Sequence, residues 1–174
     1  AEILAGALPE LILRIQWPKT MYWTGKGGVR FIRPIRWLVA LLDSNVVNFE
    51  LAGVKSGNLT YGHRLAGNGA VPVTITNFEQ QLEEHGVIVS AKKRRERIGN
   101  AIAAHRVQAD PALLETLVYI TELPTPILGD FDPDYLRLPR EVLSTVMRHH
   151  QKYFSVEDAE GRLAPHFIEI GRTS

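Results

Sequence analysis

The chain has 174 residues, of which 45% are hydrophobic and 22% charged, with a formal net charge of +1 and no cysteine. These values exclude disordered, coiled-coil and collagen-like chains and predict a compact chain, residues 1–174, organised as a single domain or a fragment of one. The lack of cysteine excludes disulfides and thiolate metal sites, and no apolar run approaches the roughly 20 residues of a membrane helix, so we expect a cytoplasmic protein without membrane contact.

The charged residues are unevenly distributed along the chain. Residues 11–42 hold six basic residues and no acid, whereas residues 107–136 hold six acids and no base. This distribution predicts a molecule with two electrically different sides. The alternative, that these sequence blocks do not become surface patches, stays open at this point.

The first segment has apolar residues at the spacing of an amphipathic helix over residues 2–15. Pro9 interrupts this pattern and should kink or divide the helix. Because the chain opens in the middle of the pattern, without a methionine or a cap, we expect a piece excised from a longer protein. We expect a helical lead-in over residues 1–25 and an α+β core over residues 29–174.

A strand-rich region follows the lead-in. Residues 33–43 form an apolar run that begins with a proline and predicts a central strand. Asp43-Ser44-Asn45 is typical of a turn, and residues 46–54 alternate apolar with polar, which predicts an antiparallel return strand. A polar, glycine-punctuated loop over residues 56–64 comes next and carries a potential recognition cluster.

Four helices are predicted from their caps and from apolar residues at helical spacing. Their approximate ranges are 77–85, 90–106, 110–122 and 140–151. Thr76 and Glu79 form a capping box for the first helix, and Ser90 caps the second. Asp110 and Pro111 form a strong start for the third.

The basic residues between positions 92 and 97 lie in the first turns of the second of these helices. They indicate either an RNA or partner surface or a solvated face. The fourth helix should bury its apolar residues, which are Val142, Leu143, Val146 and Met147.

Further strands are predicted at residues 87–89, near residues 127–128, and in a hairpin formed by residues 152–158 and 164–170. Hairpins and helices therefore alternate without regular βαβ repetition. This order favours an α+β fold, in which antiparallel hairpins are interleaved with short helices, over a doubly wound fold.

The sequence offers little support for catalysis or metal binding. His149 and His150 are adjacent, so their side chains diverge by about 100° on a helix, whereas a helical metal pair needs spacing of three or four residues. A nucleophile elbow of the Gly-x-Ser-x-Gly type is missing as well. We therefore expect neither a catalytic residue nor a metal site.

Nucleic-acid binding is better supported, because several segments combine cations, amide and imidazole donors, and an aromatic ring. RNA recognition uses this combination to hold phosphates and 2′-hydroxyls and to stack on unpaired bases. The candidate contact residues are Arg33, Arg36, His63, Arg64, Arg148, His149, His150, Gln151, Lys152 and Tyr153. The structural alternative is equally supported: Tyr153 and Phe154 pack into the core while Gln151 and Lys152 cap the last carbonyls of the helix.

Four strings of the sequence also carry a family resemblance. They are Arg-Pro-Ile-Arg-Trp-Leu-Val-Ala-Leu-Leu at 33–42, Ser-Gly-Asn-Leu-Thr-Tyr-Gly-His-Arg at 56–64, Leu-Pro-Arg-Glu-Val-Leu at 138–143, and His-Gln-Lys-Tyr-Phe at 150–154. In this order and spacing they resemble the β subunit of bacterial glycyl-tRNA synthetase over nearly the whole chain. Tyr61 and Arg36 depart from the residues that the resemblance leads us to expect at those positions.

The resemblance implies a heterotetramer in which the α subunit carries the class II aminoacylation site, using ATP and Mg²⁺, and the β subunit supplies tRNA binding. The chain would be an N-terminal to central part of the β subunit, with a fold similar to the B3/B4 domain of phenylalanyl-tRNA synthetase β subunits. Its implied partners are the α subunit, tRNA(Gly) and the remaining domains of the β subunit. It would hold no cofactor and catalyse nothing by itself.

Three functions stay open under this resemblance. The first is a module that contacts and positions tRNA. The second is an architectural module that braces the other domains, and the third is an editing-type deacylase.

Overall fold

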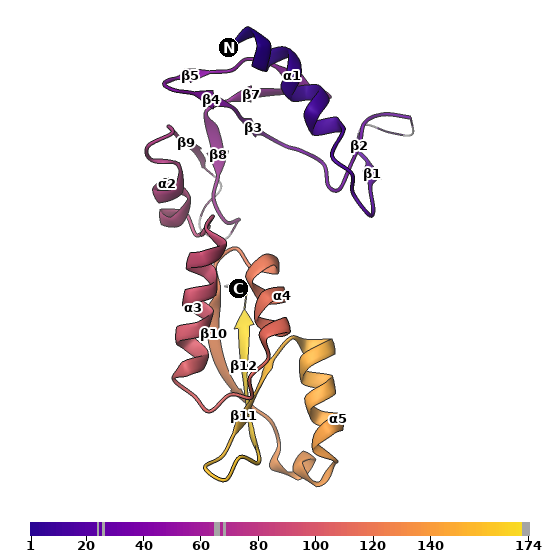
Figure 1. Cartoon of the computed structure of the whole chain (residues 1–174), viewed down its shortest axis with the longest axis vertical. Coiled ribbons are helices and arrows are strands. Elements are labelled where there is room, and N and C mark those ends of the chain that lie inside the picture. The colour runs from indigo at the N-terminus through magenta and orange to yellow at the C-terminus, as the bar shows by residue number, and fades with distance from the viewer. Residues whose placement is uncertain (24, 26, 65–66, 68, 172–174) are drawn as a thin grey trace. The chain divides into compact units, whose positions relative to one another are not determined.

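The computed structural model describes residues 1–23, 25, 27–64, 67 and 69–171 (Figure 1). It contains short helices and small, mostly antiparallel sheets, which confirms the predicted α+β class with hairpins interleaved among helices. The chain forms two compact units, Ala1–His85 and Gly86–Ser174. Residues 1–25 and the first strands that follow them belong to the same unit. Among the described residues, no helix is both long and apolar enough to cross a membrane.

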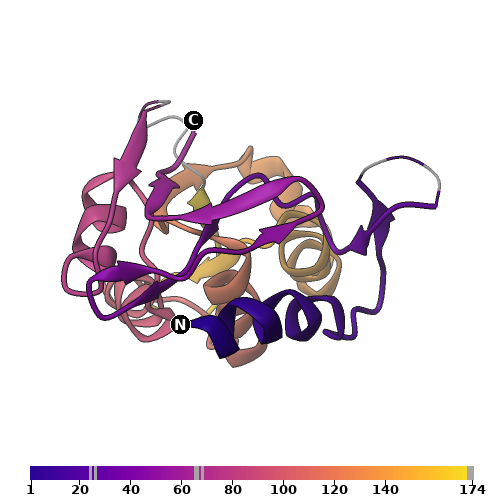
Figure 2. The same ribbon diagram turned by 90° about the horizontal axis from the view of Figure 1, so that it is seen from above.

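The first unit consists of two helices and a series of very short strands. They are α1 (Glu2–Leu13), β1 (Met21–Tyr22), β2 (Arg30–Phe31), β3 (Leu38–Val39), β4 (Leu41–Leu42), β5 (Asn45–Val46), β6 (Glu50–Leu51), β7 (Val54–Gly57), β8 (Leu59–Tyr61), β9 (Ala70–Pro72) and α2 (Phe78–Glu84). Antiparallel pairs join β1 to β2, β4 to β5, β6 to β7 and β8 to β9, and β3 joins β7 in parallel. Figure 2 shows the β1–β2 hairpin projecting away from the other strands of this unit.

The central strand predicted over residues 33–43 is wrong, because the structure divides it into β3 and β4. The backbone of Ala40, between them, bonds in two directions: its N–H donates to the Gly57 carbonyl at 3.2 Å, and its carbonyl accepts from the Val47 N–H at 2.9 Å. The chain therefore passes from one small sheet to another at Ala40. The predicted turn at residues 43–45 is confirmed by the β4–β5 pairing, with Asp43 at a positive φ of 53°.

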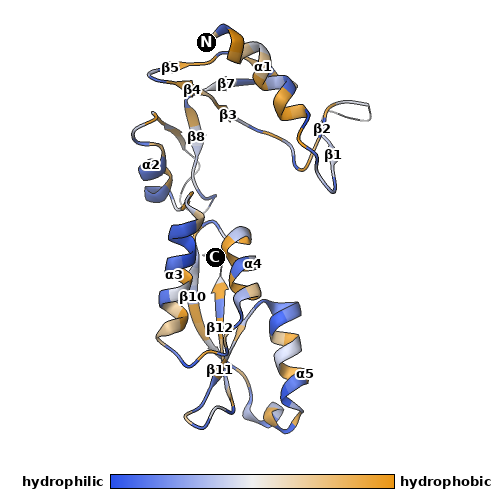
Figure 3. Cartoon of the chain, viewed as in Figure 1, coloured by the Kyte–Doolittle hydropathy of each residue, from blue (hydrophilic) through white to orange (hydrophobic). Residues whose placement is uncertain are grey.

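Helix α1 is one continuous helix through Pro9, so of the two outcomes predicted at this proline, a kink or a division, the division is wrong. A proline removes a single N–H from the helical ladder, and bonds on both sides persist, from Ala5 N to Ala1 O at 2.9 Å and from Arg14 N to Glu10 O at 3.0 Å. No residue of α1 is buried. Figure 3 shows its apolar character in orange, and Ile3 at its start is 87% exposed.

The second unit consists of four helices or helical turns, a three-stranded sheet and one 3-10 turn. They are α3 (Ala91–Ala103), α4 (Pro111–Ile120), β10 (Thr125–Asp130), η1 (Pro133–Arg137), α5 (Arg140–Thr145), the π-helical turn η2 (Val146–Gln151), β11 (Phe154–Glu157) and β12 (Leu163–Gly171). The sheet order is β10-β12-β11, antiparallel throughout. The predicted C-terminal hairpin is confirmed as β11 and β12, and the predicted strand near residues 127–128 is confirmed within β10.

The core of the second unit lies between this sheet and the helices α3 and α4. Its buried residues are Ile98, Leu113, Leu117, Val118, Phe154, Val156, Ile168 and Ile170. Each such side chain contributes about 1.5–3 kcal/mol when it is fully buried. The first residue of β11, Phe154, is 1% exposed and so fixes the start of that strand to the helices.

Two of the predicted helix caps are confirmed and one is wrong. The Ser90 hydroxyl accepts from the Lys93 N–H at 3.3 Å, and the Asp110 carboxylate accepts from the Leu113 N–H at 2.9 Å. The capping box is wrong, because α2 begins after Asn77 rather than after Thr76. Asn77 instead exchanges hydrogen bonds with Thr74, which leaves Thr76 outside the cap.

The remaining differences concern residues 87–89 and the fourth helix. Residues 87–89 form no strand; the Ile88 N–H donates to the Glu122 carbonyl at 2.9 Å outside any sheet. The predicted burial of the fourth helix is wrong in part: Met147 is buried, but Val142 and Val146 are 49% and 44% exposed. The reason is that the polar residues Glu141, Ser144 and Thr145 of α5 line a pocket, so the apolar residues do not all face the core.

Candidate functional site at a helix–strand junction

The residues 148–153 lie where the chain leaves the helical turn η2 and enters β11. Lys152 adopts the left-handed conformation, with φ 63°, and ends the helical turn. The Tyr153 N–H donates to the Met147 carbonyl at 2.9 Å, and the Lys152 ammonium donates to the His149 carbonyl at 3.0 Å. These bonds satisfy carbonyls that the end of a helix leaves without a partner.

Two aromatic residues fix this junction to the sheet. Phe154 is buried in the core, and the Tyr153 ring stacks on the Phe167 ring with centroids 4.5 Å apart and an angle of 8° between the planes. Burial, followed by the neighbouring Glu169 carboxylate, raises the pKa of the Tyr153 phenol. Tyr153 is therefore held against the sheet as a neutral ring.

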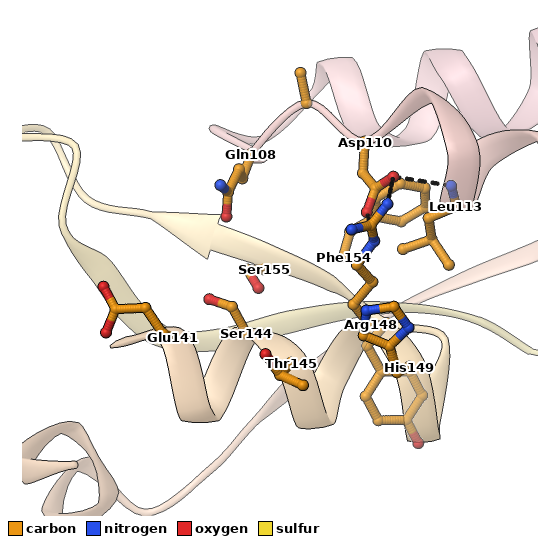
Figure 4. A pocket seen from close by; sticks show the side chains of 12 residues that line it. Gln108, Asp110, Leu113, Glu141, Ser144, Thr145, Arg148, His149, Phe154 and Ser155 are labelled. Atoms are coloured by element: carbon orange, nitrogen blue, oxygen red, sulfur yellow. Dashed lines mark hydrogen bonds and ion pairs between the residues drawn. The ribbon is translucent and has the colours of Figure 1, made fainter. Parts of the chain in front are cut away.

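Arg148 is engaged inside the unit. Its guanidinium lies against both carboxylate oxygens of Asp110, with Nε 2.5 Å from Oδ2 and Nη2 3.1 Å from Oδ1. The same carboxylate accepts from the Leu113 N–H at the start of α4 (Figure 4). Arg148 thus connects the turn η2 to the first turn of α4, and its charge is balanced by Asp110.

A polar pocket of about 300 Å³ opens beside this ion pair (Figure 4). Its lining residues are Gln108, Ala109, Asp110, Leu113, Glu141, Ser144, Thr145, Arg148, His149, Tyr153, Phe154 and Ser155. The Ser144 hydroxyl oxygen is buried here and has no hydrogen-bond partner among the described residues. A polar atom of this kind is costly to leave unsatisfied, so the pocket suits a polar occupant.

The junction residues do not all face this pocket. Gln151 and Lys152 line a second hollow, of about 320 Å³, together with Glu169 and the end of α4. His150 is exposed, as are His149 and Gln151. Of the six consecutive candidates, three therefore line the first pocket and two line the second, whereas His150 lines neither of these two.

The other four candidates belong to the first compact unit. Arg33, Arg36 and Arg64 are exposed, and His63 is half-buried. The His63 N–H donates to the His85 carbonyl at 2.8 Å, at the C-terminal end of α2. Each group of candidates is thus held within its own unit, four in Ala1–His85 and six in Gly86–Ser174.

The basic residues at the start of α3 have a structural role that the sequence did not reveal. Arg94 donates to the carbonyls of Val118, Ile88 and Val89 at 2.7, 2.6 and 2.8 Å. Arg97 donates to the Pro124 carbonyl at 2.7 Å. A sequence does not show which distant backbone carbonyl an arginine will bind. Neither interpretation of this cluster, as a contact surface or as a solvated face, therefore included these hydrogen bonds.

Arg95 forms an ion pair with Glu115, across the helices α3 and α4. The hydrogen bond raises the pKa of Arg95 and lowers the pKa of Glu115. At the outer side of α3, Lys92 is 85% exposed and lies 3.9 Å from Glu96. Within this cluster, Lys92 and Arg95 therefore lie beside carboxylates, whereas Arg94 and Arg97 bind neutral carbonyls, which do not balance their charge.

The part of the chain that the structure describes contains no group of three histidine, aspartate or glutamate residues arranged to hold a metal ion. His166 lies against Asp130 across β12 and β10, with Nδ1 2.5 Å from Oδ1. This pair is distant in sequence from His149 and His150 and belongs to the sheet.

Comparison with known proteins gives a consistent result. The family model described as "Glycyl-tRNA synthetase beta subunit" matches residues 1–173. The chain is 46% identical over 177 residues to the glycine–tRNA ligase beta subunit of Acidobacterium capsulatum, an alignment covering 96% of this chain and 25% of that protein. It is also 46% identical to the corresponding subunit of Moorella thermoacetica and 41% identical to that of Clostridioides difficile, over 94% and 98% of this chain and 25% of each relative. The chain thus spans about a quarter of the length of the curated relatives that it matches.

Proposed function

Because this chain belongs to the glycyl-tRNA synthetase beta subunit family, we propose that it is a non-catalytic part of a β subunit that helps to bind and position tRNA. The partners in this proposal are tRNA(Gly), the α subunit that would perform glycylation with ATP and Mg²⁺, and the remaining domains of the β subunit. The proposed assembly is a heterotetramer in the cytoplasm.

The observation that carries the proposal is the exposed set of donors at the junction. His149, His150 and Gln151 are exposed on the turn η2, and the neighbouring residues on both sides are fixed by the Arg148–Asp110 and Tyr153–Phe167 contacts. Donors on a rigid turn lose little conformational entropy when they bind. Imidazole and amide groups can donate to phosphates, 2′-hydroxyls and the edges of unpaired bases.

A non-catalytic role is supported by the chemistry of the pocket beside the junction. Its serine, Ser144, makes no hydrogen bond to a base among the described residues. A serine nucleophile needs such a base within hydrogen-bond reach. The pocket therefore lacks the arrangement that would activate Ser144.

The test uses the α and β subunits assembled together, with His149, His150 and Gln151 of the β subunit all changed to alanine. We expect weaker tRNA binding and a lower kcat/KM for tRNA in glycylation, because donors to phosphates, 2′-hydroxyls and base edges are lost. The matched control changes His105 and Tyr135 to alanine, since these side chains of the same unit are exposed and lie outside the junction. Equal tRNA binding by the junction variant and the control would contradict the proposal.

A second candidate function is architectural, and the contacts of Arg148, Tyr153 and Phe154 within the unit favour it. It predicts that Tyr153→Ala and Phe154→Ala unfold the unit, whereas the triple junction variant charges tRNA normally. A third candidate is an editing-type deacylase. That candidate fails if the assembled subunits do not deacylate mischarged tRNA.

A further inference from the structure

Two aromatic rings of the first unit lie side by side at its surface. Trp37 is 42% exposed and Tyr61 is 39% exposed, and their ring centroids are 4.7 Å apart with an angle of 55° between the planes. Trp37 directly precedes β3, and Tyr61 is the last residue of β8, a strand that contacts β3. Neither ring belongs to the ten candidate contact residues.

The strand β8 explains why Tyr61 faces outward. Its central residue, Thr60, is buried opposite the buried Val71 of β9, and the alternation of a strand then places Tyr61 on the exposed face. The next residue is Gly62, where an added Cβ would overlap the Cβ and the carbonyl oxygen of His85. This close approach fixes the chain immediately after Tyr61 against the end of α2.

The chain segments that carry the two rings are cationic. Arg33 and Arg36 precede Trp37, and Arg64 follows Tyr61 by three residues. All three arginines are exposed, and none takes part in an ion pair among the residues that the structure describes. Both chain segments are free of acids, from position 11 to 42 and from position 51 to 78.

We propose that Trp37 and Tyr61 form a stacking platform for an unpaired base of RNA, with Arg33, Arg36 and Arg64 holding the phosphates on either side. Aromatic faces stack on bases only when the bases are unpaired and accessible, whereas cations beside the rings attract the backbone. The charge distinguishes this occupant from an apolar protein segment, which would gain nothing from three exposed arginines. The proposal rests on the proposed function in taking the RNA to be tRNA.

The first arm of the test measures binding of a labelled single-stranded RNA of about twelve mixed nucleotides to the assembled α and β subunits. Trp37→Ala and Tyr61→Ala are each expected to weaken binding about tenfold, whereas Trp37→Phe retains most of it because a ring face remains. An RNA duplex of the same length should bind equally to all of these variants. Tyr135→Ala is the matched control, because Tyr135 is a 56% exposed tyrosine of the other unit.

The second arm replaces Arg36 by alanine, a change that leaves the ring packing intact. It should weaken single-stranded binding and reduce the slope of log affinity against log salt by about one. Unchanged RNA binding by Trp37→Ala and Arg36→Ala in correctly assembled protein would overturn the platform. Loss of α–β assembly with normal RNA binding would overturn it too, since the surface would then serve a protein partner.

These outcomes are separable from those of the proposed function. If the Trp37 and Arg36 variants bind RNA normally but the junction variant binds tRNA weakly, the platform is wrong and the proposed function stands. If the junction variant binds tRNA normally but the Trp37 and Arg36 variants bind RNA weakly, the assignment at residues 149–151 is wrong and the platform stands.

Discussion

The ring of Phe167 occupies the space in which a side chain at Gly129, its pairing partner on β10, would lie. A Cβ added at Gly129 would overlap the Phe167 ring, and the Tyr153 ring stacks on the same phenylalanine. Glycine at position 129 therefore leaves the space that the Phe167 ring, on which Tyr153 stacks, needs in order to lie against the sheet.

Gly129→Ala should lower the free energy of unfolding by about 1–3 kcal/mol, because the added methyl group must displace Phe167. Chemical denaturation measures the change. Gly99→Ala in α3 is the control: nothing lies within 4 Å of the position that its added methyl group would take, and alanine in a helix interior should be neutral or stabilising. Equal effects of the two substitutions would contradict the role of Gly129.

Arg148 and Asp110 should be coupled in stability. Asp110→Asn keeps the cap at the start of α4 but removes the charge, and Arg148→Ala removes the other partner. We expect a coupling energy of about 1 kcal/mol in a double-mutant cycle, since the pair has two contacts but Arg148 is 46% exposed. His150→Ala, by contrast, should change stability by less than about 0.5 kcal/mol. Additive effects at positions 110 and 148 would show that the ion pair does not hold the junction.

Lys152 should tolerate glycine better than alanine. Both substitutions remove the bond from the ammonium to the His149 carbonyl, but only alanine keeps a Cβ in the left-handed conformation. We expect Lys152→Gly to be more stable than Lys152→Ala by about 1 kcal/mol, measured as the difference in unfolding free energy. The reverse order would indicate that the junction has another backbone conformation.

The raised pKa of Tyr153 predicts a pH dependence at alkaline pH. The folded state binds the phenolic proton more tightly than the unfolded state, whose tyrosine has the ordinary pKa of about 10. The resulting stability is fully present below about pH 10 and is lost as pH rises through the folded pKa. An absorbance titration should therefore show one tyrosine that ionises at a higher pH than the others, and this step should be missing in Tyr153→Phe. The stability of Tyr153→Phe should also fall less than that of the unsubstituted protein above about pH 10. A titration unchanged by this substitution would contradict the prediction.

Several features that depend on neighbouring residues were predictable from the sequence, although the capping box predicted at Thr76 and Glu79 is wrong. Ser90 and Asp110 cap their helices through side chains that reach only three residues ahead, so the chemistry is contained in the local sequence. The same holds for the turn at residues 43–45 and for the C-terminal hairpin. The α+β class follows from the order of such local features.

Features that depend on distant segments were not predictable. The apolar run at residues 33–43 gives no indication that Ala40 would bond to two sheets. Val142 and Val146 follow helical spacing, but they are exposed because polar residues of the same helix line the pocket. At the candidate site, the residue types of 148–153 were evident, whereas the partners of Arg148 and Tyr153 lie 38 residues upstream and on the last strand.

Arg94 has a consequence for how the second unit opens. One guanidinium binds carbonyls before α3 and a carbonyl in the last turn of α4, so neither helix end can fray without releasing acceptors of the other. The start of α3 and the end of α4 should therefore exchange their amide hydrogens with a shared opening free energy, as one cooperative segment. The acceptors form a forked arrangement that lysine, with a single nitrogen, does not match. Position 94 is thus constrained by geometry rather than by charge.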